Sequence, residues 1–216
     1  AVNKTNHHYY CLAKENSLVD REEFLNLCRQ CDLETQTCRL EFVDHKHLQL
    51  VVKVREYLID IVALRRLCWR KLQHQRIKVY LKTEASRESV AKYCLVVNCT
   101  YANLNALLDP TVHSPRYYQF EICEKPLIKL PPEFHRQSIV IIDGPFACID
   151  PYGETAYHVM GNVVQAIHAT NVGYYPEVPA VLKPVLNRGV IKNPPITKFP
   201  LFVESVSHFI PKLKVA

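Results

Sequence analysis

The sequence predicts an α+β (mixed α/β) protein, in which helices and strands follow one another up to residue 110 and strands dominate afterwards. In the first half, segments with the apolar spacing of helices lie beside segments in which every second residue is apolar. After Pro110, short apolar runs are separated by turns rich in Asp, Pro and Gly, which indicates an antiparallel sheet. With 216 residues, of which 48% are hydrophobic, the chain is long enough to bury a core.

The first predicted helix begins at Asp20, whose side chain is a suitable N-cap and is followed by an acidic first turn. Helical spacing then places apolar residues on one face of about three turns. These residues are Phe24, Leu27, Cys28 and Cys31.

A strand-helix-strand order is predicted next. Period-two alternation indicates a half-buried strand at residues 48–54. Asp60 caps a second helix, and alternation returns at residues 77–81. The continuous apolar run at 94–97 is typical of a strand covered on both faces. The apolar stripe of the second helix consists of Ile61, Leu64, Leu67, Cys68 and Leu72.

Consecutive strands and tight turns are predicted after Pro110. The strands are expected at residues 117–123, 127–130, 138–142, 155–160 and 163–168, with turns at 143–145 and 150–153. The proline-rich stretch from Gly173 to Pro200 predicts an extended segment, with one short helix at residues 203–209.

Charge and composition narrow the class of protein. The net charge is +6, and its densest basic stretch, Arg65 to Lys78, favours a solvated helix face over the alternative of a nucleic-acid patch. No apolar run approaches the about 18 residues of a membrane span, and residues 1–4 lack the apolar region of a signal peptide. We therefore expect a soluble, cytoplasmic protein in which Cys94, Cys99 and Cys123 are buried and reduced.

Glycine is almost absent from the chain. The earliest glycine is Gly144, and only five occur in all. Loops that bind nucleotide phosphates need glycine because the backbone must approach the phosphates closely. Neither G-x-G-x-x-G nor G-x-x-x-x-G-K-[ST] occurs here.

Histidine and cysteine clusters suggest sites, each with a structural alternative. Cys28, Cys31, Cys38, His45 and His47 offer zinc ligands, but their spacing fits no standard finger, so we favour a core role and predict no metal. Imidazole and phenol groups at His8, Tyr9 and Tyr10 either line a ligand pocket or begin a strand. His158 and His168, on successive predicted strands, either face a cleft or are packed.

The end of the covered strand, Val96 to Ala102, is the most specific local signal. Ligands of α/β sheets bind at the carboxyl ends of such strands. Alternatively, Thr100 only caps the following turn.

These residues resemble a family. Leu95 to Thr100, preceded by a helix and the strand at 77–81, is similar to the segment of FAD-dependent oxidoreductases of the D-amino-acid-oxidase (DAO) type that reaches the cofactor a second time. The resemblance implies that Glu84 and Ala85 lie near the adenine, and Thr100 and Tyr101 near the diphosphate or ribose. The family usually has glycine after this threonine, where Tyr101 stands here. It also implies that the substrate side is formed by His8, Tyr9, Tyr10 and His158.

The resemblance implies an organisation in three parts. Residues 1–47 would form an entry segment with an amphipathic helix, and residues 48–110 would form part of an FAD-binding layer. Residues 111–216 would form an antiparallel sheet like that of the family's substrate domain, ending in a proline-rich segment. The family's glycine-rich loop would precede residue 1, and its last cofactor segment would follow residue 216. The expected function is the central part of an FAD-dependent oxidoreductase acting on an amine or hydroxy compound, with weak FAD binding by these residues alone. The alternative is a non-catalytic module that binds a ligand or a protein.

Overall fold

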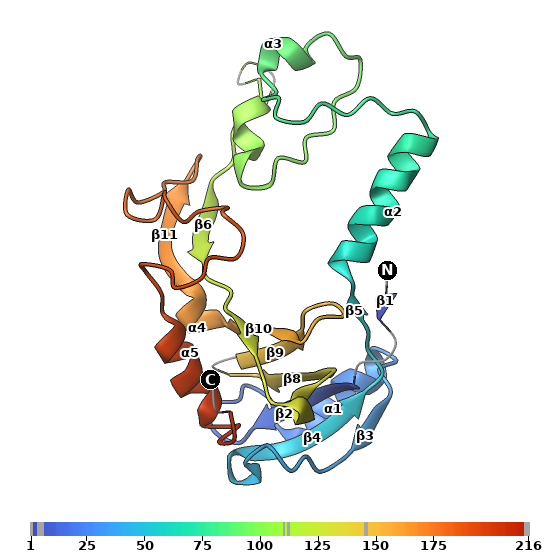
Figure 1. Ribbon diagram of the computed structural model, residues 1–216, viewed down its shortest axis with the longest axis vertical. Coiled ribbons are helices and arrows are strands. Elements are labelled where there is room, and N and C mark those ends of the chain that lie inside the picture. The colour runs from blue at the N-terminus through green and yellow to red at the C-terminus, as the bar shows by residue number, and fades with distance from the viewer. Residues whose placement is uncertain (1, 4–6, 110, 112, 145–146, 214–216) are drawn as a thin grey trace. The chain divides into compact units, whose positions relative to one another are not determined.

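The computed structural model describes residues 2–3, 7–109, 111, 113–144 and 147–213 (Figure 1). The chain forms two compact units that alternate along the sequence. The first comprises Ala1–Lys71, Glu124–Ala166 and Pro195–Ala216, and the second comprises Leu72–Cys123 and Ile167–Pro194. The division into 1–47, 48–110 and 111–216 stays a prediction.

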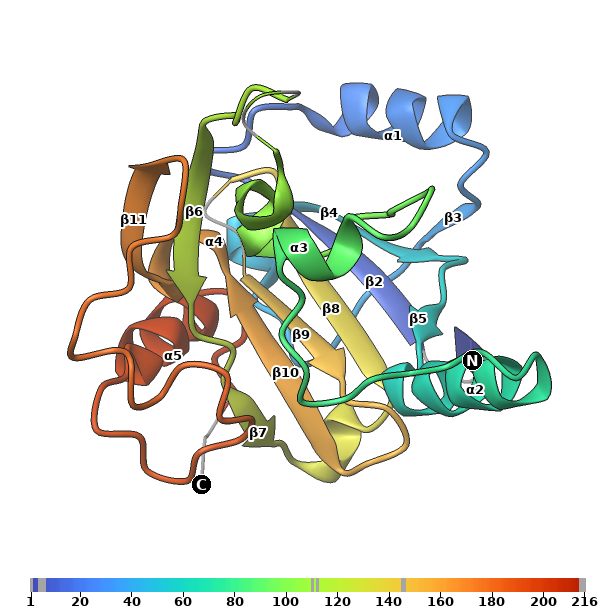
Figure 2. The same ribbon diagram turned by 90° about the horizontal axis from the view of Figure 1, so that it is seen from above.

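A seven-stranded sheet forms the first unit, in the order β3-β4-β2-β8-β9-β10-β7 (Figure 2). Neighbouring strands are antiparallel except β2 and β8, which are parallel. The predicted α+β class with a large, mostly antiparallel sheet is thereby confirmed. The strands are β2 (His7–Ala13), β3 (Thr35–Thr37), β4 (Leu48–Val54), β7 (Leu127–Lys129), β8 (Gln137–Ile142), β9 (Ala147–Pro151) and β10 (Tyr157–Asn162).

One face of this sheet, here called face A, carries the larger core. Side chains alternate between the two faces of a strand, so residues paired in register share a face. Cys11, Ile139 and Ile149 lie on face A and are almost completely buried. They belong to one cluster with Phe202 and Val206 of α5 (Phe199–Ser207). The helix predicted at 203–209 is thus confirmed, with an earlier start.

The opposite face, face B, packs against α1 (Arg21–Gln30). Phe24 and Cys28 of α1 cluster with Leu12, Leu50 and Val52. The predicted N-cap is confirmed, because Asp20 Oδ1 accepts hydrogen bonds from the backbone N–H groups of residues 22 and 23, at 2.7 and 2.9 Å. The prediction was wrong for Leu27 and Cys31, which are exposed, because the buried arc of α1 runs through Phe24, Leu25 and Cys28 instead.

The second predicted helix is confirmed as α2 (Ile61–His74). Asp60 Oδ1 accepts a hydrogen bond of 2.9 Å from the backbone N–H of Ala63, as expected of a cap. No residue of α2 is buried, so its apolar stripe is exposed. The remaining short elements of this unit are β1 (Val2–Asn3), β5 (Leu58–Ile59), the 3₁₀ helices η1 (His45–His47) and η3 (Pro132–Phe134), and α4 (Val163–Ala166).

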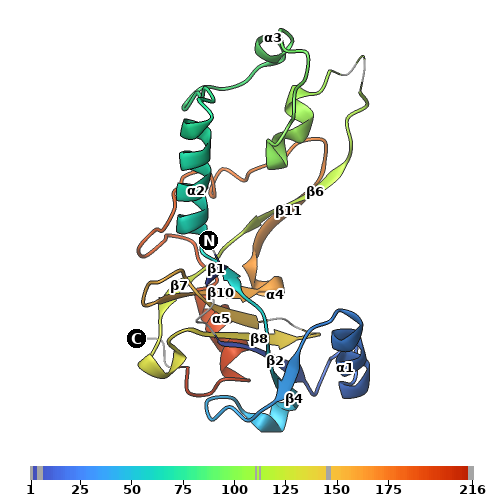
Figure 3. The same ribbon diagram turned by 90° about the vertical axis from the view of Figure 1, so that its right-hand side faces the viewer.

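The second unit holds a two-stranded antiparallel ribbon of β6 (Tyr118–Cys123) and β11 (Ile167–Gly173), which lie side by side in Figure 3. It also contains α3 (Arg87–Val90) and the 3₁₀ helix η2 (Tyr101–Leu107). Buried Asn105 joins its segments, because the side-chain amide donates to the carbonyl oxygens of Arg116 and Tyr174 at 2.8 and 2.7 Å.

Two expected strands of the FAD-type layer are wrong. Residues 77–81 and 94–97 form neither strand nor helix, and Leu81, Leu95 and Val97 are 68%, 78% and 76% exposed. A covered strand needs a paired neighbour and a layer on each face. The described residues of this unit pair only β6 with β11, so these runs have no partner. Cys94 and Cys99 are consequently exposed rather than buried, and Cys123, at the end of β6, is exposed as well.

Three local expectations also need correction. Residues 163–166 are helical rather than extended, because Asn162 Oδ1 accepts a hydrogen bond of 2.8 Å from the backbone N–H of Gln165 and caps α4. Asp150 and Pro151 belong to β9, so the turn starts later than expected. The predicted turn at 143–145 ends outside the described residues.

Within the part of the chain that the structure describes, no helix is both long and apolar enough to cross a bilayer.

The burial of Phe202 predicts the contribution of α5 to stability. Phe202→Ala removes a fully buried ring and should lower the free energy of unfolding by about 3–5 kcal/mol. Leu201→Ala, at the neighbouring exposed position of the same helix, is the control and should change it little. Urea denaturation measures both; equal losses would contradict the placement of α5 on face A.

Candidate functional site

A group of polar side chains occupies the part of face B formed by β8 and β9. His8 of β2 is paired in register with Ser138 of β8, and Val140 of β8 with Cys148 of β9. Because His8 lies two and four residues before Tyr10 and Leu12, it shares face B with them. We call His8, Ser138, Cys148 and Asp150 the face-B cluster.

The carboxylate of Asp150 is held by two donors. The buried hydroxyl of Ser138, only 2% exposed, donates to Asp150 Oδ1 at 2.6 Å. The thiol of Cys148 also forms a hydrogen bond with Asp150. Burial and then the charge of Asp150 raise the pKa of the Cys148 thiol to about 11. Cys148 is therefore a protonated donor at neutral pH, and the carboxylate is fixed in orientation.

His8 brings an imidazole to the same cluster. Its side chain is 4% exposed, and Nε2 has no hydrogen-bond partner among the described residues. Burial lowers the pKa of His8, although the charges of Glu56 and Asp150 act in the opposite direction. His8 is thus neutral at pH 7 and retains one unused ring nitrogen beside two carboxylates.

Tyr10 continues the polar row along β2. Its hydroxyl donates to Glu56 Oε2 at 2.5 Å, and burial followed by this hydrogen bond raises its pKa. The ring packs edge-on against Phe24 of α1, with centroids 6.3 Å apart. Tyr10 therefore stands at the border between the α1-covered half of face B and the face-B cluster.

Gly161 of β10 lies opposite Cys148 and leaves room for its thiol. A Cβ atom at Gly161 would collide with Cys148 Sγ and would lie 3.8 Å from Lys125 Nζ. The ammonium group of Lys125 lowers the pKa of Cys148, against the larger effects of burial and Asp150. A cation and an anion therefore flank the thiol.

The surroundings of the cluster are apolar and half-exposed. Val140 and Val159 flank it on face B, and neither belongs to a hydrophobic core cluster. A half-exposed apolar wall with a few convergent polar groups is the usual composition of a small-molecule site. The half-exposed carboxylate of Asp150 can accept hydrogen bonds from a ligand.

The four predicted substrate residues divide between the two faces of the sheet. His8 and Tyr10 lie on face B at the cluster. Tyr9 packs against the face-A core, and His158, 3% exposed, is bonded through Nε2 to the carbonyl oxygen of Phe134 at 2.9 Å. The structure thus brings two of the four together, and their roles in binding stay predictions.

The predicted cofactor residues form no cradle in the second unit. Glu84 and Ala85 are exposed in a segment without helix or strand. Tyr101 is 91% exposed and has φ of 55°, in the left-handed region that favours glycine. The hydroxyl of Thr100 donates to Asn98 Oδ1 at 2.8 Å and makes no cap for η2. These residues as placed do not fit a nucleotide, and their cofactor contacts stay predictions.

The cysteines and histidines considered for zinc are not brought together. Cys28 is in the core between α1 and face B, whereas Cys38 packs against the face-A core. His45 Nε2 is bonded to the carbonyl oxygen of Leu40 at 2.9 Å. Across the described residues, no group of three or more His, Cys, Asp or Glu side chains is arranged to hold a metal.

Sequence reasoning missed Ser138, Cys148, Asp150 and Gly161. Asp150 belongs to an Asp-Pro-Tyr-Gly turn motif, which hid its place at the end of β9. Period-two spacing within each strand puts Ser138 with Val140 and Cys148 with Asp150. The pairing of β2 with β8, which places His8 beside them, has no local signal in the sequence.

Comparison of the chain with protein-family models, with curated proteins and with solved structures found no match.

The contact between Gly161 and Cys148 can be tested by a pair of substitutions. Gly161→Ala should destabilise the fold by about 1–3 kcal/mol, because the new methyl group displaces the thiol. Adding Cys148→Ala should recover most of this loss. Gly173→Ala in β11, where a Cβ meets only ordinary contacts, is the control. Additive losses in the double variant, measured by urea denaturation, would contradict the predicted contact.

The lowered pKa of His8 predicts a loss of stability in acid. Because His8 binds its proton less readily in the folded than in the unfolded chain, its contribution is full above pH 6.5 and falls as the pH decreases toward the folded pKa. The difference between the unfolding free energies at about pH 7 and about pH 5 should therefore be smaller in His8→Gln than in the parent. His74→Gln, the same substitution at an exposed position, is the control. A His8→Gln variant whose stability depends on pH as steeply as that of the parent would refute the assignment.

Proposed function

We propose that this chain supplies the substrate-binding sheet of an FAD-dependent oxidoreductase that acts on an amine or hydroxy compound. The observation that carries the proposal is the half-exposed part of face B, where Asp150 is fixed by Ser138 and Cys148 beside the neutral imidazole of His8. The resemblance of the sequence to enzymes of the DAO type supports the class of chemistry.

The charges and hydrogen-bonding groups of the cluster suit such a substrate. Both amines and alcohols present N–H or O–H donors, and the carboxylate of Asp150 is an acceptor. Two donors already orient the carboxylate, so little side-chain entropy is lost when a ligand binds. The valines beside the cluster exclude water from one side of the site.

In this proposal the flavin carries the redox chemistry and the sheet orients the substrate. The resemblance assigns residues 48–110 to part of an FAD-binding layer, although the strands expected at 77–81 and 94–97 are not formed. Because the four expected cofactor residues do not form a site as placed, we assign no step of the reaction to them. FAD binding by these 216 residues alone should be weak.

A non-catalytic binding module is the second candidate, and one observation favours it. The two expected strands of the FAD layer are not formed, and their apolar side chains are exposed. The same face-B cluster would then bind a small ligand without chemistry. The flavin content of the complete natural polypeptide separates the two functions.

The oxidoreductase proposal predicts a flavoprotein whose activity depends on Asp150. The complete natural polypeptide should contain stoichiometric FAD and should produce peroxide with an amine or hydroxy substrate. Asp150→Asn should lower kcat/KM by about tenfold to hundredfold, because one charged hydrogen bond is worth about 1.5–3 kcal/mol. Absorbance of the bound flavin and a coupled peroxide assay measure the two effects.

Glu133→Gln provides the matched control, because Glu133 is exposed in η3 and outside the cluster. It should leave both flavin content and kcat/KM unchanged. A complete polypeptide without flavin would reject the oxidoreductase. Full flavin with unchanged activity in Asp150→Asn would reject only the placement of the substrate at face B.

A further inference from the structure

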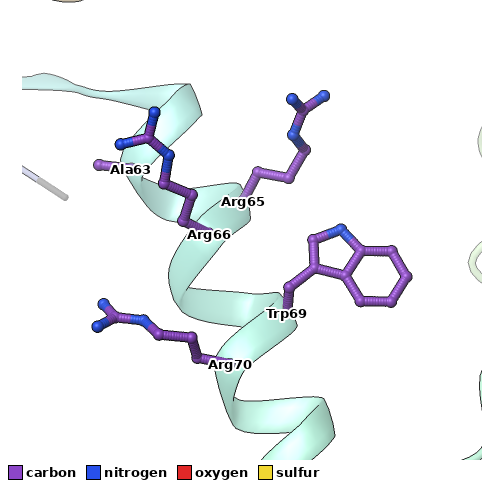
Figure 4. A pocket seen from close by; sticks show the side chains of 5 residues that line it. All are labelled: Ala63, Arg65, Arg66, Trp69 and Arg70. Carbon is purple, nitrogen blue, oxygen red and sulfur yellow. The ribbon is translucent and has the colours of Figure 1, made fainter.

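A basic depression lies along α2. It has a volume of about 760 Å³ and is open to solvent. In Figure 4, Arg66, Arg70 and Ala63 lie on one side of the helix and Arg65 and Trp69 on the other. Residues 61–71 contain four Arg or Lys side chains and no acidic residue. The depression therefore combines the apolar ring of Trp69 with the guanidinium groups of Arg65, Arg66 and Arg70.

The first unit also presents a surface of opposite charge. Leu18, just before α1, is 85% exposed, more than most large apolar side chains of the described chain. Between residues 14 and 23, the carboxylates of Glu15, Asp20, Glu22 and Glu23 outnumber the cations of Lys14 and Arg21. Leu18 is thus an exposed apolar side chain in an acidic surround. We call residues 15–23 the acidic knob.

We propose that the acidic knob of one copy of this chain docks on the α2 depression of a second copy. Leu18 packs against the Trp69 ring, while carboxylates of the knob pair with the arginines of the depression. Two such contacts related by a twofold axis make an isologous dimer, the commonest symmetry of soluble oligomers. This contact uses neither the face-B cluster nor a cofactor, so it goes beyond the proposed function.

The composition of both surfaces favours a protein partner over nucleic acid. Trp and Arg are the residues that contribute most at protein interfaces. A nucleic acid would neutralise the arginines but would leave Leu18 exposed. A second copy covers both surfaces at once, and each carries the charge that the other lacks.

Exchange of charges between the two surfaces tests the dimer. Light scattering after gel filtration of the 216-residue chain should give the mass of two copies. Arg66→Glu and Leu18→Lys should each raise the dimer dissociation constant more than about tenfold, because the first brings like charges together and the second removes the central apolar contact. Combining Arg66→Glu with Glu22→Arg should restore the dimer. Trp69 is the only tryptophan, so its fluorescence reports the same equilibrium as the protein is diluted.

Matched controls use the same changes at other exposed sites of the first unit. Arg39→Glu and Leu201→Lys should leave the dimer intact, and circular dichroism checks that each variant is folded. A parent chain that is monomeric throughout would overturn the proposal. So would a dimer that tolerates both Arg66→Glu and Leu18→Lys, or a monomer whose Trp69 fluorescence responds to a single-stranded oligonucleotide.

Discussion

The parallel pairing of β2 with β8 is the constraint on which the first unit depends. It joins residues 7–12 to residues 137–142 across most of the chain and forms the centre of the sheet. Its register puts Cys11 beside Ile141 on face A and His8 beside Ser138 on face B. A slip of one residue would exchange the two faces and destroy both cores. The loop-closure entropy of so distant a contact is offset by burial of apolar side chains on both sides.

The polar groups of the face-B cluster lower the stability of the fold, and for this reason we attribute a function to them. Burying the unpartnered Nε2 of His8 costs about 1–3 kcal/mol, and an apolar residue there would avoid this penalty. Ser138 and Cys148 compensate for the partial burial of Asp150 by donating to its carboxylate. A polar network on an otherwise apolar sheet face breaks the usual pattern of burial, and such exceptions concentrate at binding sites.

The sequence predicted correctly those elements that depend on interactions between residues close together in the chain. The cap at Asp20, the strand at 48–54 and α2 follow from spacing and side-chain chemistry within a few residues. His8 and Tyr10 were singled out because imidazole and phenol groups can hydrogen-bond a ligand while their rings pack. Their partners Ser138 and Asp150 come from strands that pair through tertiary contacts. Residues 77–81 and 94–97 failed for the same reason: a strand also requires a neighbour, which apolar composition cannot supply.

The two candidate functions differ in what would cover the exposed apolar side chains of the second unit. Leu81, Leu95, Val97 and Tyr101 are exposed in a unit whose described strands form one two-stranded ribbon, and such a ribbon alone is only marginally stable. In the oxidoreductase these side chains pack into the rest of a nucleotide-binding layer, so cofactor binding and stability of this unit increase together. In a binding module a partner takes that place and flavin has no effect. The face-B cluster belongs to the first unit and is the same for both candidate functions. What binds to the exposed apolar side chains of the second unit therefore distinguishes the oxidoreductase from the binding module.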